Sequence, residues 1–129
     1  MNLTGKKVLI VEDDEHIARV YSIKLGKEGV ILFNAYDGED GLKKIQSEMP
    51  DIVLLDLMLP LKDGFWVLEE KAKLSEEIKK IPVIVLSNLG QADDINHARS
   101  LGAVDYVIKA GTSIQAVVDR VKEHLEKQV

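Results

Sequence analysis

Four short apolar runs constrain the fold of this chain more than any other feature of its sequence. The runs are residues 8–11, 52–55, 83–86 and 104–108. They are rich in β-branched residues and do not alternate regularly with polar positions. Strands with this pattern are buried on both faces, as they are in a parallel sheet that helices cover on both sides. A weaker run over residues 30–36 predicts a fifth strand between the first two.

Amphipathic stretches between the runs predict five helices. They are expected between Asp14 and Gly29, over residues 37–49, 64–74 and 92–101, and from Thr112 onward. Asp14 and Thr112 are the expected N-caps of the first and last helices, because short oxygen-bearing side chains accept hydrogen bonds from helix N–H groups. Leu42, Ile45 and Met49 are expected to form the buried stripe of the second helix.

This alternation of strands and helices uses the whole chain. At 129 residues the chain has the size of one domain, so residues 1–129 are expected to fold as a single unit. Right-handed crossovers between parallel strands then give an α/β, flavodoxin-like fold. We predict a five-stranded parallel doubly wound sheet in the strand order 2-1-3-4-5, with five helices.

Composition argues against several functional classes. The formal net charge is −5 and no Lys/Arg cluster is present, so direct nucleic-acid binding is not expected. There are no cysteines, which leaves out disulfides and thiolate metal sites. The first apolar run is too short for a signal sequence or a membrane span. We therefore expect a cytoplasmic protein without membrane contact.

Chemically useful side chains follow four of the predicted strands. In a doubly wound fold, ligands bind beyond the carboxyl ends of the strands. The residues at these ends are Glu12 and Asp13, Asp56, Ser87, and Lys109. The carboxylate of Asp56 comes after four apolar residues and is costly to bury unless it is paired or binds a metal. Asp13 and Asp56 would repel each other without a cation, and Mg²⁺ or Mn²⁺ suits such oxygen ligands.

This set of groups fits phosphoryl transfer to Asp56. A carboxylate is a competent nucleophile toward phosphorus and forms an acyl phosphate. The ammonium group of Lys109 and the hydroxyl of Ser87 can each bind an oxygen of the transferring phosphoryl group. We therefore predict Asp56 as the phosphoacceptor, with Lys109 and Ser87 as its catalytic partners.

Four segments give the chain a resemblance to the response-regulator receiver family of two-component signalling, the CheY-like domains. The segments are VLIVEDDE, DIVLLDLMLPLKDG, IPVIVLS and GAVDYVIK. The resemblance implies a histidine kinase or a histidine phosphotransfer protein as phosphoryl donor, and a downstream protein as target. It also implies a monomer or a phosphorylation-dependent dimer. The domain would be no enzyme beyond its own phosphorylation and dephosphorylation.

The resemblance also assigns roles to individual residues around the metal. Asp56 resembles the phosphoacceptor, which is also a metal ligand. Asp13 resembles the direct metal ligand, and Glu12 the acid that acts through a metal-bound water. Met58 resembles the residue whose backbone carbonyl binds the metal. All four assignments are expectations from the matching positions in this sequence.

Further roles follow from the same resemblance. Ser87 and Tyr106 resemble the switch pair, in which the aromatic ring turns inward when the hydroxyl moves toward the phosphoryl group. A packed strand tyrosine with its hydroxyl at the surface is the alternative for Tyr106. Lys109 resembles the phosphate-binding lysine, and Gly64 the glycine of the loop after the acceptor.

One position departs from the family. Receiver domains usually carry proline after the lysine, joined by a cis bond, whereas this chain has Ala110 and Gly111 after Lys109. A cis bond before alanine costs about 3 kcal/mol, so a trans bond is favoured over a strained cis bond. Met58 and Leu89 occupy positions that influence access of water to the acyl phosphate. Because both are apolar here, we expect a long-lived phosphorylated form.

The remaining polar and aromatic residues carry weaker signals. His16, His97 and His124 share no metal-ligand spacing and are expected to be solvated helix residues. Trp66 is expected to serve in packing.

An alternative reading is a Mg²⁺-dependent phosphatase or phosphotransferase with an aspartyl nucleophile. It is disfavoured because no second acid follows Asp56 closely, Asp63 being seven residues on, and because no cap segment is present. A flavodoxin-like cofactor binder is disfavoured by the lack of a phosphate-binding loop after the first strand. The pattern does not distinguish a stand-alone receiver from a domain of a longer regulator.

Overall fold

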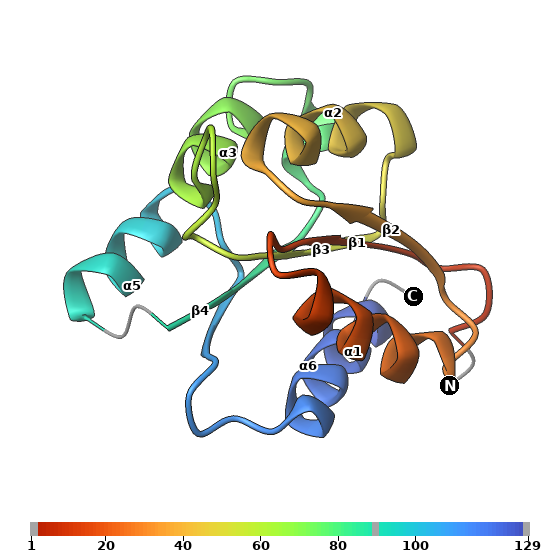
Figure 1. The fold of residues 1–129 in the computed structure, drawn as a ribbon. Helices are drawn as coiled ribbons and strands as arrows, with labels where there is room; N and C mark the ends of the chain where they lie inside the picture. The colour runs from red at the N-terminus through yellow and green to blue at the C-terminus, as the bar shows by residue number, and fades with distance from the viewer. Residues whose placement is uncertain (1–2, 89–90, 128–129) are drawn as a thin grey trace.

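The computed structural model describes residues 3–88 and 91–127, and in these residues five parallel strands form a sheet (Figure 1). The strands are β1 (Lys7–Val11), β2 (Ile31–Ala35), β3 (Ile52–Leu55), β4 (Val83–Ser87) and β5 (Asp105–Ile108). Their order is β2-β1-β3-β4-β5. Each predicted strand lies within two residues of its expected bounds, and the predicted topology is confirmed.

Six helices, one more than predicted, connect these strands in the described ranges. They are α1 (Glu15–Gly26), α2 (Gly38–Glu48), α3 (Gly64–Lys71), α4 (Glu76–Lys79), α5 (Ala92–Ser100) and α6 (Ile114–Glu126). The additional helix is α4, a single turn between α3 and β4. It forms because the side chain of Ser75 accepts a hydrogen bond from the Ile78 N–H group and starts a new turn after α3 has ended.

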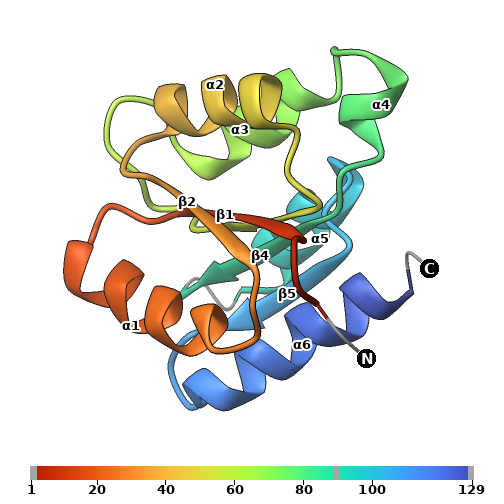
Figure 2. The same ribbon diagram turned by 90° about the vertical axis from the view of Figure 1, so that its right-hand side faces the viewer.

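The sheet separates two hydrophobic cores. Successive residues of a strand point to opposite faces, so Val8 and Ile10 of β1 enter one core while Leu9 and Val11 enter the other. Helices α1 and α6 cover the first face, and α2, α3 and α5 cover the second (Figure 2). Burial on both faces explains why the strand sequences do not alternate. No helix in the described part of the chain is long and apolar enough to cross a membrane.

Local capping confirms one expected helix start and corrects another. Asp14 caps α1, and its Oδ1 accepts hydrogen bonds from the backbone N–H groups of His16 and Ile17. The prediction that Thr112 caps the last helix is wrong. Ser113 takes that place and accepts a hydrogen bond from the Ala116 N–H group, because α6 begins one residue later than expected.

The buried stripe of α2 is shorter than predicted. Ile45 is fully buried and Leu42 is half-buried, but Met49 is 38% exposed. Met49 lies at the C-cap with a left-handed φ of 47°, which turns its side chain off the helical face. The helix therefore ends one residue before the predicted stripe does.

Candidate functional site

Strand register brings the predicted acidic residues together at one edge of the sheet. Val11, the last residue of β1, pairs with Leu55, the last residue of β3. The Asp56 N–H group continues this ladder by donating to the Val11 carbonyl at 3.0 Å. Glu12 likewise extends the pairing of β1 with β2 and donates to the Ala35 carbonyl. The side chains of Glu12 and Asp56 thus start from neighbouring backbone positions.

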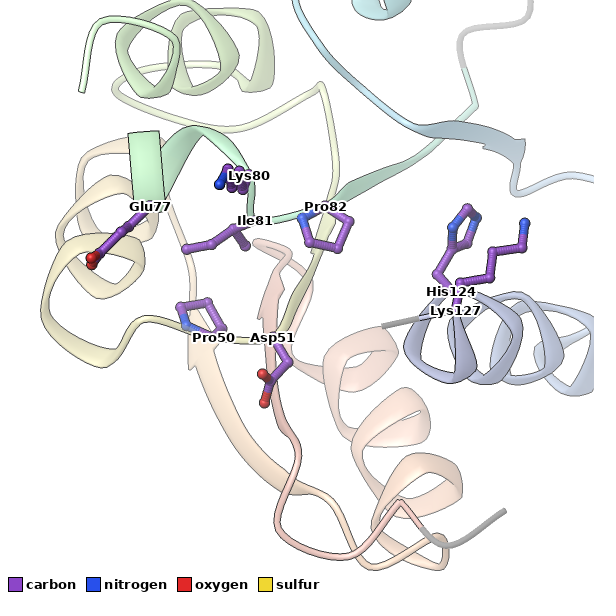
Figure 3. A pocket seen from close by; sticks show the side chains of 8 residues that line it. All are labelled: Pro50, Asp51, Glu77, Lys80, Ile81, Pro82, His124 and Lys127. Carbon is purple, nitrogen blue, oxygen red and sulfur yellow. The ribbon is translucent and has the colours of Figure 1, made fainter. Parts of the chain in front are cut away.

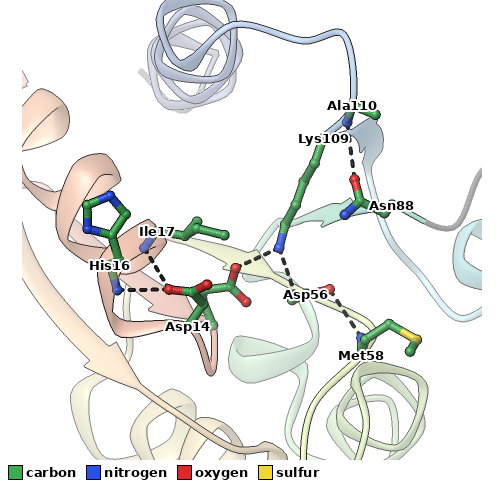
Figure 4. A network of polar contacts seen from close by, with 9 residues as sticks. Asp14, His16, Ile17, Asp56, Met58, Asn88, Lys109 and Ala110 are labelled. Carbon is green, nitrogen blue, oxygen red and sulfur yellow. Dashed lines mark hydrogen bonds and ion pairs between the residues drawn. The ribbon is translucent and has the colours of Figure 1, made fainter.

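Lys109, which directly follows the carboxyl end of β5, reaches both of these carboxylates. Its Nζ donates to Glu12 Oε1 at 2.6 Å. It also donates to Asp56 Oδ2 at 2.9 Å (Figure 4). The exposed fractions of the three side chains are 14% for Lys109, 5% for Glu12 and 9% for Asp56. One ammonium group therefore pairs with two buried carboxylates. When both acids are ionised, the cluster of Lys109, Glu12 and Asp56 has a net negative formal charge.

The excess of acids over cations in this cluster affects the pKa of Glu12. Burial raises the pKa of Glu12 to about 7, and its contact with Asp56 adds to the rise while Lys109 opposes it. Burial also lowers the pKa of Lys109, but the hydrogen bonds and charges of Asp56 and Glu12 outweigh burial and raise it above its ordinary value. The lysine is thus held in its charged form, and the two acids compete for it.

A divalent cation fits the remaining acidic capacity of this cluster. Carboxylate oxygens of Glu12, Asp13 and Asp56 lie within 4.8 Å of one another, and Asp13 is exposed at the rim. Glu12 Oε2 is buried and has no hydrogen-bond partner among the described residues. An unpaired carboxylate oxygen in a net-negative cluster suits a hard cation with oxygen ligands. The three acids could therefore hold a metal ion, in keeping with the Mg²⁺ prediction.

The loop after β3 holds the second oxygen of Asp56. The Met58 N–H group donates to Asp56 Oδ1 at 3.1 Å (Figure 4), and the Met58 side chain points outward with 62% of its surface exposed. The loop then turns tightly, since the Lys62 N–H group donates to the Pro60 carbonyl and Leu61 has a φ of 66°. A groove of about 520 Å³ runs beside the loop, with Asp13 and Met58 in its wall.

Two glycines allow this loop to lie close to its neighbours. A Cβ atom on Gly64 would lie 2.5 Å from the Asp56 carbonyl oxygen, and one on Gly38 would lie 2.0 Å from the Lys62 carbonyl oxygen. Both contacts are with backbone atoms, so a side chain at Gly64 would force the Asp56 backbone to shift, and one at Gly38 would force the Lys62 backbone to shift. The role of Gly38 was missed from the sequence, where the residue reads only as part of a helix start.

The predicted switch residues are also in contact. Ser87 is fully buried and Tyr106 is 9% exposed. Burial raises the pKa of Tyr106, with the charge of Asp94 adding to the rise, whereas a hydrogen bond with Ser87 lowers it. Tyr106 therefore lies in the core that α2, α3 and α5 cover, rather than standing with a free hydroxyl at the surface.

The backbone after Lys109 follows the trans expectation. No cis peptide bond occurs in the described residues, so the Lys109–Ala110 bond is trans. The ammonium group of Lys109 nonetheless reaches both carboxylates. Leu89, the second residue invoked for the lifetime of the phosphorylated form, lies outside the described residues.

The histidines differ from one another more than expected. His16 is exposed, as predicted, and His97 is exposed but stacks on Phe65 with ring centroids 4.6 Å apart. The prediction is wrong for His124, whose Nε2 lies 3.2 Å from Asp105 Oδ2 in a half-buried position. The tertiary pairing of α6 with β5 makes this contact, which helical periodicity alone could not show. Trp66 packs against the second core, as expected.

A separate cavity lies at the amino ends of β3 and β4, away from the acidic cluster. Its volume is about 360 Å³, and its walls include Asp51, Lys80, His124 and Lys127 (Figure 3). Asp51 accepts a hydrogen bond from the Lys7 N–H group at 2.7 Å. None of the predicted site residues lines this cavity. The residues from which chemistry is expected therefore lie elsewhere, at the carboxyl edge of the sheet.

The fold and this site together define a class: a doubly wound domain with an acidic, lysine-bridged cluster beyond its strands. The model of the response regulator receiver domain family matches residues 8–122. This chain belongs to that family, and thus to the receiver domains of two-component signalling.

Known proteins resemble the chain in sequence and in structure. A probable transcriptional regulator, ycf27 of Guillardia theta, is 41% identical over 106 residues, which are 82% of this chain and 40% of that protein. The chain thus spans well under half of this relative. The receiver domain of the Francisella response regulator 1452 has a TM-score of 0.87 at 29% identity, covering 97% of this chain and 100% of that one. The phosphorylated cyanobacterial phytochrome response regulator RcpA has a TM-score of 0.82 at 30% identity, covering 98% and 97%.

Proposed function

We propose that Asp56 accepts a phosphoryl group from the phosphohistidine of a histidine kinase or phosphotransfer protein. The observation that carries the proposal is the placement of Asp56, which is buried and bonded to Lys109 through one oxygen and to the Met58 N–H group through the other. Family membership and the phosphorylated relative RcpA support the same reaction.

The reaction forms one bond and breaks one bond. A carboxylate oxygen of Asp56 bonds to phosphorus as the P–N bond of the donor breaks. The electron pair of that bond stays on the imidazole nitrogen, which then takes up a proton. Lys109 stays charged and can pair with a phosphoryl oxygen in place of a carboxylate, and the Met58 N–H group can donate to another oxygen.

The same residues would hold Mg²⁺ in the proposed function. Asp13, Asp56 and the Met58 carbonyl are its proposed direct ligands, and Glu12 acts through a bound water. When bound, Mg²⁺ supplies positive charge that offsets the acids and the incoming phosphoryl group. The orphaned Glu12 Oε2 atom supports this assignment.

The output is a change in a protein-binding surface. The Ser87 hydroxyl carries a single proton to donate, and it bonds to Tyr106 in this structure. If that hydroxyl turns toward a phosphoryl group on Asp56, the contact with Tyr106 must rearrange. The proposal includes the cytoplasmic location, the downstream protein target, and the monomer or phosphorylation-dependent dimer expected from the sequence.

The alternative of an aspartyl phosphatase gains no support from the geometry. Asp63 is the nearest following acid, and its Oδ1 accepts a hydrogen bond from the Trp66 N–H group as the N-cap of α3. It is thereby committed to the helix start rather than placed to protonate a leaving group.

Acetyl phosphate tests the proposed function directly. The wild-type protein and Asp56→Asn are incubated with acetyl phosphate and Mg²⁺, and intact masses are measured. We expect one added phosphoryl group on the wild type and none on the variant, with uptake by the wild type falling when EDTA removes Mg²⁺. Equal uptake by Asp56→Asn, or no uptake by the wild type, would contradict the proposal.

A further inference from the structure

A side-chain hydrogen bond joins the loop that follows β4 to the loop that follows β5. Asn88 follows Ser87 at the end of β4, and Ala110 follows Lys109 at the end of β5. Asn88 Oδ1 accepts a hydrogen bond from the Ala110 N–H group at 3.2 Å (Figure 4). The residue after the proposed switch serine is therefore tied to the residue after the proposed phosphate-binding lysine.

The backbone beyond Lys109 has few other supports. The Lys109 N–H group donates to the Ser87 carbonyl at 2.9 Å, which continues the pairing of β4 with β5. The Lys109 carbonyl accepts only within its own loop, from the Thr112 N–H group at 3.2 Å, among the backbone bonds of the described residues. Ala110 and Gly111 are both exposed, so core packing does not hold them.

This hydrogen bond between Asn88 and the Ala110 N–H group, here called the tie, depends on Ala110, the residue by which this chain departs from its family. Proline has no backbone N–H group and could not donate to Asn88. Alanine at position 110 provides the donor and, with a trans bond before it, leaves the backbone freer than proline would. Asn88 supplies a restraint at the point where the proline restraint is missing.

We propose that Asn88 is a positioning residue for Lys109. By holding the peptide group that follows the lysine, its amide oxygen keeps the Lys109 ammonium between Glu12 and Asp56. Among the described residues, Asn88 makes no hydrogen bond to Lys109, Glu12 or Asp56, so we infer that it acts through the backbone of Ala110. For its effect on phosphorylation the inference rests on the proposed function, but the hydrogen bond itself can be tested without that function.

Hydrogen exchange tests the tie by itself. The exchange rate of the Ala110 amide is measured by NMR in the wild type, Asn88→Ala and Asn88→Asp. We expect faster exchange at Ala110 in Asn88→Ala, and protection retained in Asn88→Asp, whose carboxylate keeps the acceptor. The matched control is Gln91→Ala, because Gln91 is exposed in the same loop and makes no side-chain capping bond. An unchanged Ala110 exchange rate in Asn88→Ala would overturn the proposal.

Phosphorylation by acetyl phosphate tests the positioning. Loss of one exposed hydrogen bond should slow phosphorylation of Asn88→Ala by about threefold to tenfold. Mg²⁺ affinity, measured by calorimetry, should not fall, because Lys109 is not a proposed ligand and competes with the metal for the carboxylates of Glu12 and Asp56. Equal losses of rate and Mg²⁺ affinity would indicate a general disturbance of the site and overturn the proposal.

A double-mutant cycle identifies the partner of Asn88. Ala110→Pro removes the N–H donor, whereas Ala110→Ser keeps it and serves as the control. Asn88→Ala should slow phosphorylation in the Ala110→Ser background but add nothing in the Ala110→Pro background. A full effect in both backgrounds would overturn the proposal. If the wild type takes up no phosphate, the proposed function fails, and the Ala110 exchange rate still decides whether the tie exists.

Discussion

The two ends of β5 carry charge clusters of opposite character. At the carboxyl end, Lys109 bridges Glu12 and Asp56, and one carboxylate oxygen of Glu12 is left without a hydrogen-bond partner among the described residues. At the amino end, Asp105 accepts two hydrogen bonds from Arg120, at 2.8 and 2.7 Å, and lies 3.2 Å from His124. The first cluster has two acids for one ammonium group and leaves one carboxylate oxygen unpaired. In the second cluster, both carboxylate oxygens of the single acid accept hydrogen bonds.

The pKa shifts of the acids follow this difference. Burial raises the pKa of Glu12, and Lys109 does not compensate. Burial also acts to raise the pKa of Asp105, but hydrogen bonds from Arg120, His124 and its own backbone neighbour lower it below its ordinary value. A satisfied cluster stabilises the fold, whereas an unsatisfied one keeps capacity for a ligand. This contrast suggests which charges serve structure and which serve function.

The largest expected effect is on stability when the lysine is removed. Lys109→Met leaves Glu12 and Asp56 facing each other without a cation, so the free energy of unfolding at pH 7 should fall by about 3 kcal/mol. Mg²⁺ should restore more stability to the variant than it adds to the wild type, because no ammonium group competes for the acids. Urea unfolding with and without Mg²⁺ measures both, with exposed Lys80→Met as control. An equal gain in stability from Mg²⁺ in both proteins would contradict the view that Lys109 and Mg²⁺ compete for the same carboxylates.

Removing the acid of the second cluster should have a smaller effect that depends on pH. Asp105→Asn should lower the free energy of unfolding at pH 7 by about 1 to 2 kcal/mol, because charge-assisted hydrogen bonds are lost. Since the folded-state pKa of Asp105 lies below its unfolded value, its contribution is complete above the unfolded pKa of about 3.9 and is lost as the pH falls through the folded pKa. The difference between wild type and variant should therefore shrink in acid, and Mg²⁺ should not alter it. A difference that grew toward low pH would contradict this sign.

The smallest effect is expected from a change that keeps the charge. Arg120 donates to both oxygens of Asp105 through Nη1, and its side chain is 47% exposed. Arg120→Lys keeps the positive charge but loses the planar donor group, so we expect a loss of only about 0.5 kcal/mol in urea unfolding. A loss as large as that of Asp105→Asn would contradict this prediction and show that the planar donor group of Arg120 provides all of the stability that the cluster contributes.

Several features of the molecule could be predicted because they depend on residues close in sequence. Apolar runs of β-branched residues predicted the strands, and Asp14 was identifiable as a cap from its position before an amphipathic stretch. The position of the candidate residues could be inferred for a related reason. The carboxyl ends of parallel strands meet at one edge of a sheet, so Glu12, Asp56, Ser87 and Lys109 could be expected to converge once the strands were known.

Other features depended on tertiary contacts. The sequence does not show that Lys109 bonds to Glu12 as well as to Asp56, because side-chain pairing depends on distances that no periodicity contains. The same holds for the contact of His124 with Asp105 and for the close approach of Gly38 to the Lys62 carbonyl. The sequence marked Ala110 as a departure from the family, but only the folded chain showed that Asn88 binds its N–H group. The sequence by itself determined which groups gather at the edge of the sheet. The tertiary structure decided which of them are paired and which keep free capacity, because pairing depends on backbone register and burial.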